Sequence, residues 1–239
     1  MAKNTFKRTE RKYMLSPQQN SEMLKILFEN MDPDDYSGAD GGYNVYNIYY
    51  DNDKNSVIRN SVSKPPYKEK LRVRSYETPD ENNKVYVEIK KKIQGVVSKR
   101  RVSMTLRQVE PFLKDGIVPE GKSPASQQMM KEILYFQSIY HSVPALYLSY
   151  GRYAFKGKVD RNFRVTVDHD IVTRRYDLRL DKGSYGDSLI GDNCLMEVKF
   201  VGTMPLWLVQ AIRRLDIKKV SFSKYGTEYE QYRKAQLGR

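Results

Sequence analysis

Alternation of polar and apolar residues is the dominant pattern along this chain, and it predicts strands. The clearest case is residues 71–92, where LRVRSY and VYVEIKKK flank a polar segment. A strand sends successive side chains to opposite faces, so Leu71 and Val73 share one face while Arg72 and Arg74 share the other. The intervening segment has the composition of a hairpin turn. The pattern therefore predicts a hairpin with one apolar face and one cationic face.

Seven strand-like runs, counting both arms of this hairpin, place charged side chains on one face and mainly apolar side chains on the other. They begin near residues 8, 71, 85, 97, 147, 163 and 195. A single amphipathic pair is ordinary, because sheets often face water on one side, but solvation does not explain carboxylates that recur among the cations. The run 43–51 is aromatic and β-branched and predicts a further strand. In the run near 97 the alternation separates Arg100 from Arg101 without showing which of them faces inward.

Helices are marked by caps and by apolar stripes. Ser16-Pro17 and Ser123-Pro124 each have the pattern of an N-cap followed by proline at the first helical position. The helices that follow, 17–31 and 125–141, carry apolar stripes, and the second stripe is wide enough to cover a sheet. A short helix or turn is expected at 52–60, and further helices are expected at 109–115, at 203–215 and after residue 225.

Two arrangements accommodate this pattern. If the charged faces point outward, the two long helices fill the space inside the sheet. If they point inward, the sheet closes into a barrel with a charged lumen, and the helices cover its apolar exterior. The inward form leaves buried cations in need of anions, because an unpaired buried charge is very costly. Arginine forks match phosphate oxygens, so a bound polyphosphate would supply those anions.

The net charge narrows the choice of partner. The 239 residues contain 42 Lys and Arg against 29 Asp and Glu, a formal charge of +13, which favours nucleic acid, an acidic membrane or phosphate compounds. The length suits a single domain over residues 1–239 with a substantial core. No run approaches the roughly 20 apolar residues that span a bilayer, and the start has no apolar signal region. We therefore expect a cytoplasmic protein without a transmembrane segment.

Cysteine and histidine are too scarce for their usual metal or redox chemistry. Cys194 is the only cysteine, which excludes an internal disulfide and predicts a buried, inert thiol, and His141 and His169 are expected to be structural. Any metal is therefore a hard cation on carboxylates, Mg²⁺ or Mn²⁺. A GxxxxGK[ST] loop is absent, which excludes a P-loop mechanism, and no serine or cysteine has an evident base partner for nucleophilic catalysis.

Six short motifs follow one another along nearly the whole chain. They are ERKY at 10–13, LRVR at 71–74, VEIK at 87–90, YGRYAF at 150–155, LMEVKF at 195–200 and SKY at 223–225. In this order they resemble the motif series of the VTC domain, the polyphosphate polymerase branch of the CYTH, or triphosphate tunnel metalloenzyme, superfamily. The resemblance implies an α+β fold: a closed antiparallel β-barrel that forms a tunnel with a charged lumen, with helices packed on the outside.

The resemblance also implies a reaction and residue roles. The chain would transfer the ATP γ-phosphate to a growing inorganic polyphosphate chain, with Mn²⁺ or Mg²⁺ as cofactor. Glu197 would hold the metal, with Asp168 either as a second ligand or as a group that positions an arginine. Tyr150 would lie against the nucleotide base, and Ser223 would assist phosphate binding. The cations that would grip phosphates are Lys12, Arg72, Arg74, Lys90, Arg152, Lys199 and Lys224.

Several alternatives stay open from the sequence. We expect ATP and inorganic polyphosphate as partners, but the same tunnel would instead hydrolyse phosphoanhydrides if Glu10 or Glu88 activated a water. A third alternative is a non-catalytic module that binds polyphosphate or nucleic acid, and no recognisable motif favours nucleic acid. Eukaryotic relatives have a histidine two places after the lysine matched by Lys90, whereas this chain has Lys92. The sequence specifies neither the oligomeric state nor whether a separate membrane partner recruits the protein.

Overall fold

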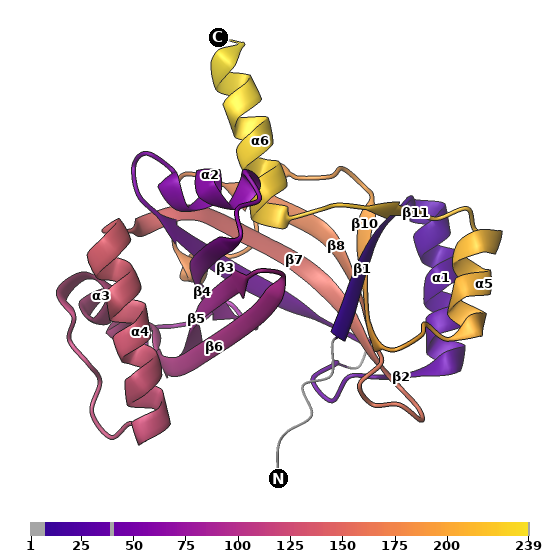
Figure 1. The fold of residues 1–239 in the computed structure, drawn as a ribbon, viewed down its shortest axis with the longest axis horizontal. Helices are drawn as coiled ribbons and strands as arrows, with labels where there is room; N and C mark the ends of the chain where they lie inside the picture. Colours follow the sequence, from indigo (N-terminus) through magenta and orange to yellow (C-terminus); the bar gives the residue numbers. More distant parts are fainter. Residues whose placement is uncertain (1–7, 39–40, 239) are drawn as a thin grey trace. The chain divides into compact units, whose positions relative to one another are not determined.

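The computed structural model of the protein describes residues 8–38 and 41–238, and the chain forms two compact units. Unit 1 comprises Met1–Asn44, Tyr150–Ile171 and Ile190–Phe222, and unit 2 comprises Val45–Ser149, Val172–Leu189 and Ser223–Arg239. Three strands run along the chain from one unit into the other: β3 (Gly42–Asp51), β7 (Val143–Gly157) and β8 (Arg164–Arg174). Figure 1 shows the order of the elements.

Unit 1 is built on the antiparallel strands β1 (Arg8–Leu15), β10 (Cys194–Val201) and β8, with β10 in the middle. The short strand β11 (Lys218–Val220) pairs with the other side of β1, and β2 (Met31–Pro33) pairs with β7. Helices α1 (Pro17–Asn30) and α5 (Leu206–Arg214) lie side by side in Figure 1. They bury Leu27 and Leu208 against strand residues such as Val167 and Val198, all 0% exposed.

Unit 2 is built on a meander of β3, β4 (Tyr67–Ser75), β5 (Lys84–Ile93) and β6 (Val96–Thr105), in which each strand pairs antiparallel with the next. Helices α3 (Leu106–Asp115) and α4 (Pro124–Tyr140) cover one face of it. Helices α2 (Ser56–Val62) and α6 (Lys224–Leu237) also belong to this unit. A 3₁₀ turn at Leu180–Lys182 precedes β9 (Asp187–Ser188), which pairs with the end of β8.

The alternation seen in the sequence decides which face of each unit is covered by helices. On β4 and β5, Leu71, Val73 and Ile89 are at most 2% exposed and pack with Phe112 of α3 and Ile133 of α4. The charged residues between them, Arg72, Arg74 and Glu88, point to the opposite face, which we call the charged face. Unit 1 repeats this arrangement, since α1 and α5 cover the apolar side chains of β1, β8 and β10. In each unit the helices therefore lie on the apolar side of the strands, as both arrangements predict.

The prediction of a closed barrel is wrong. The strand order of the sheet is β11-β1-β10-β8-β7-β3-β4-β5-β6, and within the described residues no pairing joins β11 to β6. The fold is therefore α+β, with a large open antiparallel sheet and six α-helices in the described part of the chain. Side-chain alternation specifies the buried face of a strand but not its neighbours, so closure followed from the resemblance and not from the pattern.

The predicted elements agree with the observed ones in type, and their ends differ by a few residues. The helices expected at 17–31 and 125–141 are α1 and α4, and each begins with the predicted proline after a serine whose side chain accepts a backbone N–H. The hairpin arm expected from Leu71 begins at Tyr67, and the strand expected at 163–170 continues to Arg174. Within the described residues, every helix is too short or too polar to cross a membrane.

Candidate functional site

The charged face of unit 2 holds three cations around one carboxylate. Arg72 donates from Nε to Oε2 of Glu88 at 2.8 Å, and the NH2 nitrogen of Arg72 lies 2.7 Å from the same oxygen. Arg74 Nε lies 3.9 Å from that oxygen, and Lys99 Nζ lies 2.7 Å from Oε1. Glu88 is 1% exposed. Adjacent strands β4, β5 and β6 thus bring two arginines and a lysine to a single buried anion.

Two neutral side chains of β3 hold the same arginines from the neighbouring strand. Tyr49 stands directly opposite Arg72 and accepts a hydrogen bond from its NH1 at 3.0 Å. Asn47 stands opposite Arg74 and accepts from its Nε at 2.9 Å, while the Asn47 amide donates to the Leu148 carbonyl at 2.9 Å. Asn47 is fully buried and Tyr49 nearly so. Each arginine is therefore fixed by a neutral acceptor as well as by the carboxylate.

The electrostatics of this cluster favour negative charge. Burial alone would raise the pKa of Glu88, but the neighbouring Arg72 and Arg74 outweigh it and lower that pKa to about 2. Burial would likewise raise the pKa of Tyr49, but the same two arginines and Lys70 lower it to about 8. Both groups gain negative charge more easily than usual because the cations outnumber the anions around them. An anionic ligand would meet the same potential.

The cationic pattern continues along the same strands towards the start of α6. Lys90 of β5 stands opposite Lys70 on one side and Lys99 on the other. Like charges directly opposite one another destabilise a sheet, so this row is favourable when an anion lies over it. Lys70 Nζ also donates to Ser223 Oγ at 3.3 Å. Ser223 is the N-cap of α6, and Lys224 is the first residue of that helix.

Unit 1 carries a second network, on β1 and β10. Lys12 stands opposite Glu197, and Glu10 stands opposite Lys199. Lys12 Nζ lies 3.6 Å from Glu10 and 3.8 Å from Glu197, and it donates to the Phe222 carbonyl at 2.9 Å. Lys199 Nζ forms an ion pair with Glu197 and lies 3.9 Å from Glu10. The two carboxylates are thus linked through two lysines that touch both of them.

A third group in unit 1 pairs Arg152 of β7 with Asp168 of β8. The guanidinium donates from Nε to Oδ1 at 2.6 Å and from NH2 to Oδ2 at 2.9 Å. It also lies 5.0 Å from the ring centre of Tyr150, within cation–π range. Burial would lower the pKa of Arg152, but Asp168 raises it well above the usual value. Because both oxygens of the buried Asp168 bind Arg152, the geometry favours the positioning role for this carboxylate.

The structure thus brings the predicted residues together within each unit. In unit 1, Lys12, Glu197 and Lys199 form one network, and Arg152, Asp168 and Tyr150 form another. In unit 2, Arg72 and Arg74 share Glu88, and Lys90 follows two residues later on the same strand. Ser223 is the N-cap of α6, and Lys224 is its first residue. The metal role of Glu197, the base contact of Tyr150 and the catalytic roles of the cations stay predictions.

Sequence reasoning missed the residues that position the arginines, above all Tyr49 and Asn47. It also left Arg100 and Arg101 undecided. Arg101 stands opposite Glu88 on the charged face, whereas Arg100 bonds Glu132 of α4 at 2.9 Å on the other face. The register between β5 and β6 decides this question, and no signal in the β6 sequence itself would have done so.

The carboxylates of unit 1 fit a hard divalent cation that takes only one or two of its ligands from the protein. Within the described residues, no three His, Cys, Asp or Glu side chains gather as a complete metal cage. Glu197 and Glu10 nevertheless provide carboxylate oxygens, the donors that Mg²⁺ and Mn²⁺ prefer, and Mg²⁺ commonly takes one or two carboxylates with phosphate oxygens and water as its other ligands. The donor set therefore fits an ion that arrives with a phosphate ligand.

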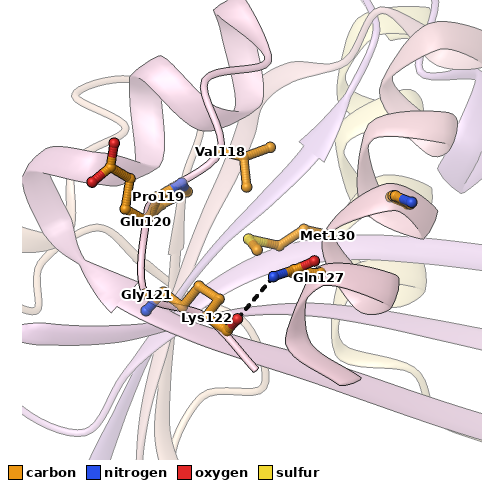
Figure 2. Close-up of a pocket in the computed structure, with 8 residues that line it drawn as sticks. Val118, Pro119, Glu120, Gly121, Lys122, Gln127 and Met130 are labelled. Atoms are coloured by element: carbon orange, nitrogen blue, oxygen red, sulfur yellow. Dashed lines mark hydrogen bonds between the residues drawn. The ribbon is translucent and has the colours of Figure 1, made fainter. Parts of the chain in front are cut away.

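A cavity of about 290 Å³ lies in another part of unit 2, between residues 118–122 and helix α4. Figure 2 shows its lining, in which Gln127 Nε2 donates to the Lys122 carbonyl at 3.0 Å. The residues around this cavity include none of the predicted site residues. The charged faces of the sheet, and not this cavity, are the candidate functional surfaces.

Comparison with known proteins gives a family and a fold. A protein of Bacillus halodurans provisionally named an adenylate cyclase has a similar structure, with a TM-score of 0.53 at 14% identity, over 90% of this chain and 92% of that one. The Mimivirus capping enzyme triphosphatase aligns over 86% of this chain and 88% of its own at 7% identity, with a TM-score of only 0.30, too low to support a shared fold. No curated protein sequence matches the chain. The family described as the VTC domain matches residues 7–233, and the chain therefore belongs to the VTC domain family.

Proposed function

We propose that this protein is a polyphosphate polymerase that transfers the γ-phosphoryl group of ATP to the end of an inorganic polyphosphate chain. The observation that carries the proposal is the cluster on β4, β5 and β6. There, two arginines and a lysine share the single buried carboxylate of Glu88, next to the row formed by Lys70 and Lys90. A protein that binds a neutral ligand has no use for such an excess of fixed cations. A chain of phosphates carries a comparable density of negative charge.

The reaction itself requires little covalent help from the protein. The terminal oxygen of polyphosphate attacks the γ-phosphorus of ATP, the bond from that phosphorus to the bridging oxygen breaks, and ADP leaves. A terminal phosphate is largely ionised at neutral pH, so it attacks without a general base. Catalysis then rests on positioning the phosphates and neutralising the charge that develops in the transition state. Fixed guanidinium groups such as those of Arg72 and Arg74 do both.

Within this proposal each unit supplies a distinct set of groups. In unit 2, Tyr49 and Asn47 fix the arginines before substrate arrives, which lowers the entropy cost of binding. In unit 1, Asp168 holds Arg152, and Lys12 and Lys199 provide further positive charge. Lys90, Lys224 and Ser223 add donors for the phosphate chain, and Tyr150 offers a flat ring for the nucleotide base.

Glu197 would hold a divalent ion, Mg²⁺ or Mn²⁺, with Glu10 beside it. A bound ion would supply positive charge next to the phosphate groups of the substrate. The lysines that touch both carboxylates keep the network neutral without it. Lys12 and Lys199 would donate to the phosphate oxygens of a bound triphosphate.

Hydrolysis of a triphosphate or polyphosphate is a second candidate, and the position of Glu10 favours it. This carboxylate is half-exposed and belongs to the same network as Glu197, so it is suited to orient a water near the ion. Glu88 is not suited to that role, because it is buried and three cations hold it. The two reactions differ in their phosphate product.

A product balance separates the two reactions. The purified protein is incubated with ATP and Mn²⁺ or Mg²⁺, and ADP, orthophosphate and polymer are quantified together. Polymerisation predicts that ADP accumulates with phosphate chains and almost no orthophosphate. Orthophosphate equal to ADP, without polymer at any metal or primer concentration, would instead establish hydrolysis. Glu197→Gln and Arg74→Ala should each abolish the product. Glu132→Gln, in helix α4 and away from the charged face, should leave it unchanged.

A further inference from the structure

The tip of the β5–β6 hairpin exposes apolar residues that have no role in the proposed reaction. The two strands are joined by the two-residue turn Gln94-Gly95, in which both residues have positive φ, 46° and 90°, as tight hairpin turns require. Three branched apolar side chains surround this turn. Ile93 is 50% exposed, Val96 is 72% exposed and Val97 is 51% exposed. Each presents about half or more of its surface to water.

These apolar side chains point to both sides of the hairpin. Ile93 and Val96 stand opposite one another as the last pair before the turn, whereas Val97 stands opposite Lys92 and points to the other face. Neither face of the tip therefore packs on the core of unit 2, which holds Ile89 but neither valine. The tip is therefore exposed and apolar, whereas hairpin turns normally contain Gly, Asn, Asp and Ser.

The other hairpin of the same strands provides an internal contrast. The turn between β4 and β5 is ETPDENNK, residues 77–84, which is polar and carries three carboxylates. That turn and the apolar tip lie at opposite ends of β5, because β5 runs from Lys84 to Ile93. One end of β5 thus carries an acidic, hydrophilic turn, and the other end carries an apolar one.

A collar of cations surrounds the apolar tip. The twelve residues 90–101, KKKIQGVVSKRR, contain six Lys and Arg and no Asp or Glu. Lys91 and Arg100 share one carboxylate, that of Glu132, at 3.7 and 2.9 Å. The neighbouring strand adds Tyr67, which stands opposite Ile93 and is 41% exposed. The preceding Pro66 accepts a hydrogen bond from the Gln94 N–H at 2.8 Å, so a proline-rich turn lies against the tip.

We propose that the β5–β6 tip docks on the surface of an anionic lipid bilayer, with Ile93, Val96 and Val97 at the boundary between headgroups and acyl chains. An apolar apex inside a basic collar matches the two layers that a peripheral protein meets, because anionic headgroups attract cations and the acyl region accepts apolar side chains. Tyr67 suits the interface between them, where amphipathic rings accumulate. The acidic turn at the far end of β5 would be repelled by the same surface, and this polarity gives the docked hairpin one orientation.

Vesicle co-sedimentation without ATP or polyphosphate tests this proposal separately from the proposed reaction. The full chain is mixed with phosphatidylcholine vesicles, or with vesicles in which about 30 mol % is phosphatidylserine, an anionic lipid of the kind that attracts basic segments. We expect binding to the anionic vesicles only. The Val96→Ser, Val97→Ser double variant should bind at least about tenfold more weakly, because each valine loses its apolar contact. The Lys91→Gln, Arg100→Gln double variant should lose about fivefold per charge.

A matched exposed valine serves as the control. Val159, in the loop after β7, is 99% exposed, so Val159→Ser makes the same chemical change outside the tip and should leave binding unchanged. The valine variants should share the melting temperature of the wild type, because the valine side chains that they replace are about half or more exposed. As a second measurement, tryptophan placed at Val96 should be quenched by brominated lipid, and tryptophan placed at Val159 should not.

Three results would overturn the proposal. The first is no association with anionic vesicles at low salt. The second is association that the valine double variant leaves intact, because binding would then be purely electrostatic and the apex would play no part. The third is a tryptophan at position 96 that brominated lipid does not quench while the protein is vesicle-bound. The membrane assignment also fails if soluble RNA or polyphosphate, and not vesicles, shields a tryptophan at position 96. The basic collar would then bind a polyanion.

Discussion

Replacing Glu88 by glutamine removes the negative charge that three cations share while almost preserving the size of the side chain. The carboxylate accepts from Arg72 at 2.8 Å, lies 3.9 Å from Arg74 and 2.7 Å from Lys99, and is 1% exposed. In Glu88→Gln these three cations repel one another with no anion between them. We therefore expect a less stable protein with a greater need for bound phosphate.

The magnitude follows from the pKa of Glu88, which the cations lower from 4.5 to about 2. A shift of this size corresponds to about 3 kcal/mol of folding free energy, in line with roughly 3–5 kcal/mol for breaking a buried ion pair. At about 2–4 °C per kcal/mol for a chain of this length, the melting temperature should fall by about 10 °C. Because the folded-state pKa is depressed, this stabilisation is complete above pH 4.5 and is lost as the pH falls towards 2. Glu88→Gln should not show this decrease in stability between pH 4.5 and 2.

Calorimetric melting with and without tripolyphosphate is the assay. Bound phosphate would replace the missing charge, so Glu88→Gln should gain more in melting temperature from tripolyphosphate than the wild type does. Glu132→Gln is the matched control, since Glu132 also contacts two cations but belongs to α4, away from the charged face, and is partly exposed. An unchanged melting temperature, or a smaller response to tripolyphosphate than that of the wild type, would refute the reasoning.

Two further changes test other parts of the site. Tyr49→Phe should remove a phenol with a pKa of about 8, which ultraviolet titration would detect as a missing ionisation. Because this pKa is depressed from 10.0, the wild type should gain stability between pH 8 and 10 and the variant should not. An identical titration of both proteins would contradict this prediction. Asp168→Asn leaves the guanidinium of Arg152 without its buried carboxylate and should destabilise the protein by about 3–5 kcal/mol, measured by urea unfolding. The matched control Asp35→Asn, at an exposed carboxylate paired with Lys156, should leave the midpoint unchanged, and equal midpoints for both variants would show that Asp168 is not a structural partner of Arg152.

Much of the fold follows from side-chain alternation. The period of two placed Arg72, Arg74 and Glu88 on one face of β4 and β5, and the structure confirms that face. Serine–proline pairs located the starts of α1 and α4 because capping is a local effect. The strands β2, β9 and β11 were missed, since two or three residues carry no period. Sheet closure was predicted wrongly because strand neighbours depend on pairing between distant segments.

The residues of the candidate site that were predicted lie mainly in recognisable sequence motifs. The predicted cations and Glu197 lie within these motifs. Lys99 lies outside them, and Asn47 and Tyr49 are neutral residues in an aromatic strand. Their role arises from the register of β3 against β4, which sets them opposite Arg74 and Arg72. The same kind of register decided between Arg100 and Arg101. Register is a long-range property, and a single strand sequence does not contain it.

The central claim is that the charged face of β4–β6 binds a chain of phosphates. Titration calorimetry of tripolyphosphate against the wild type, Arg74→Ala and Arg161→Ala tests it most directly, since Arg161 is an exposed arginine paired with Asp32 outside this face. We predict salt-dependent binding to the wild type and to Arg161→Ala. For Arg74→Ala we predict a loss of about 1.5–3 kcal/mol, the range for a hydrogen bond to a charged group, which is roughly tenfold or more in affinity. Equal affinity for all three proteins, or no binding to any, would contradict the account.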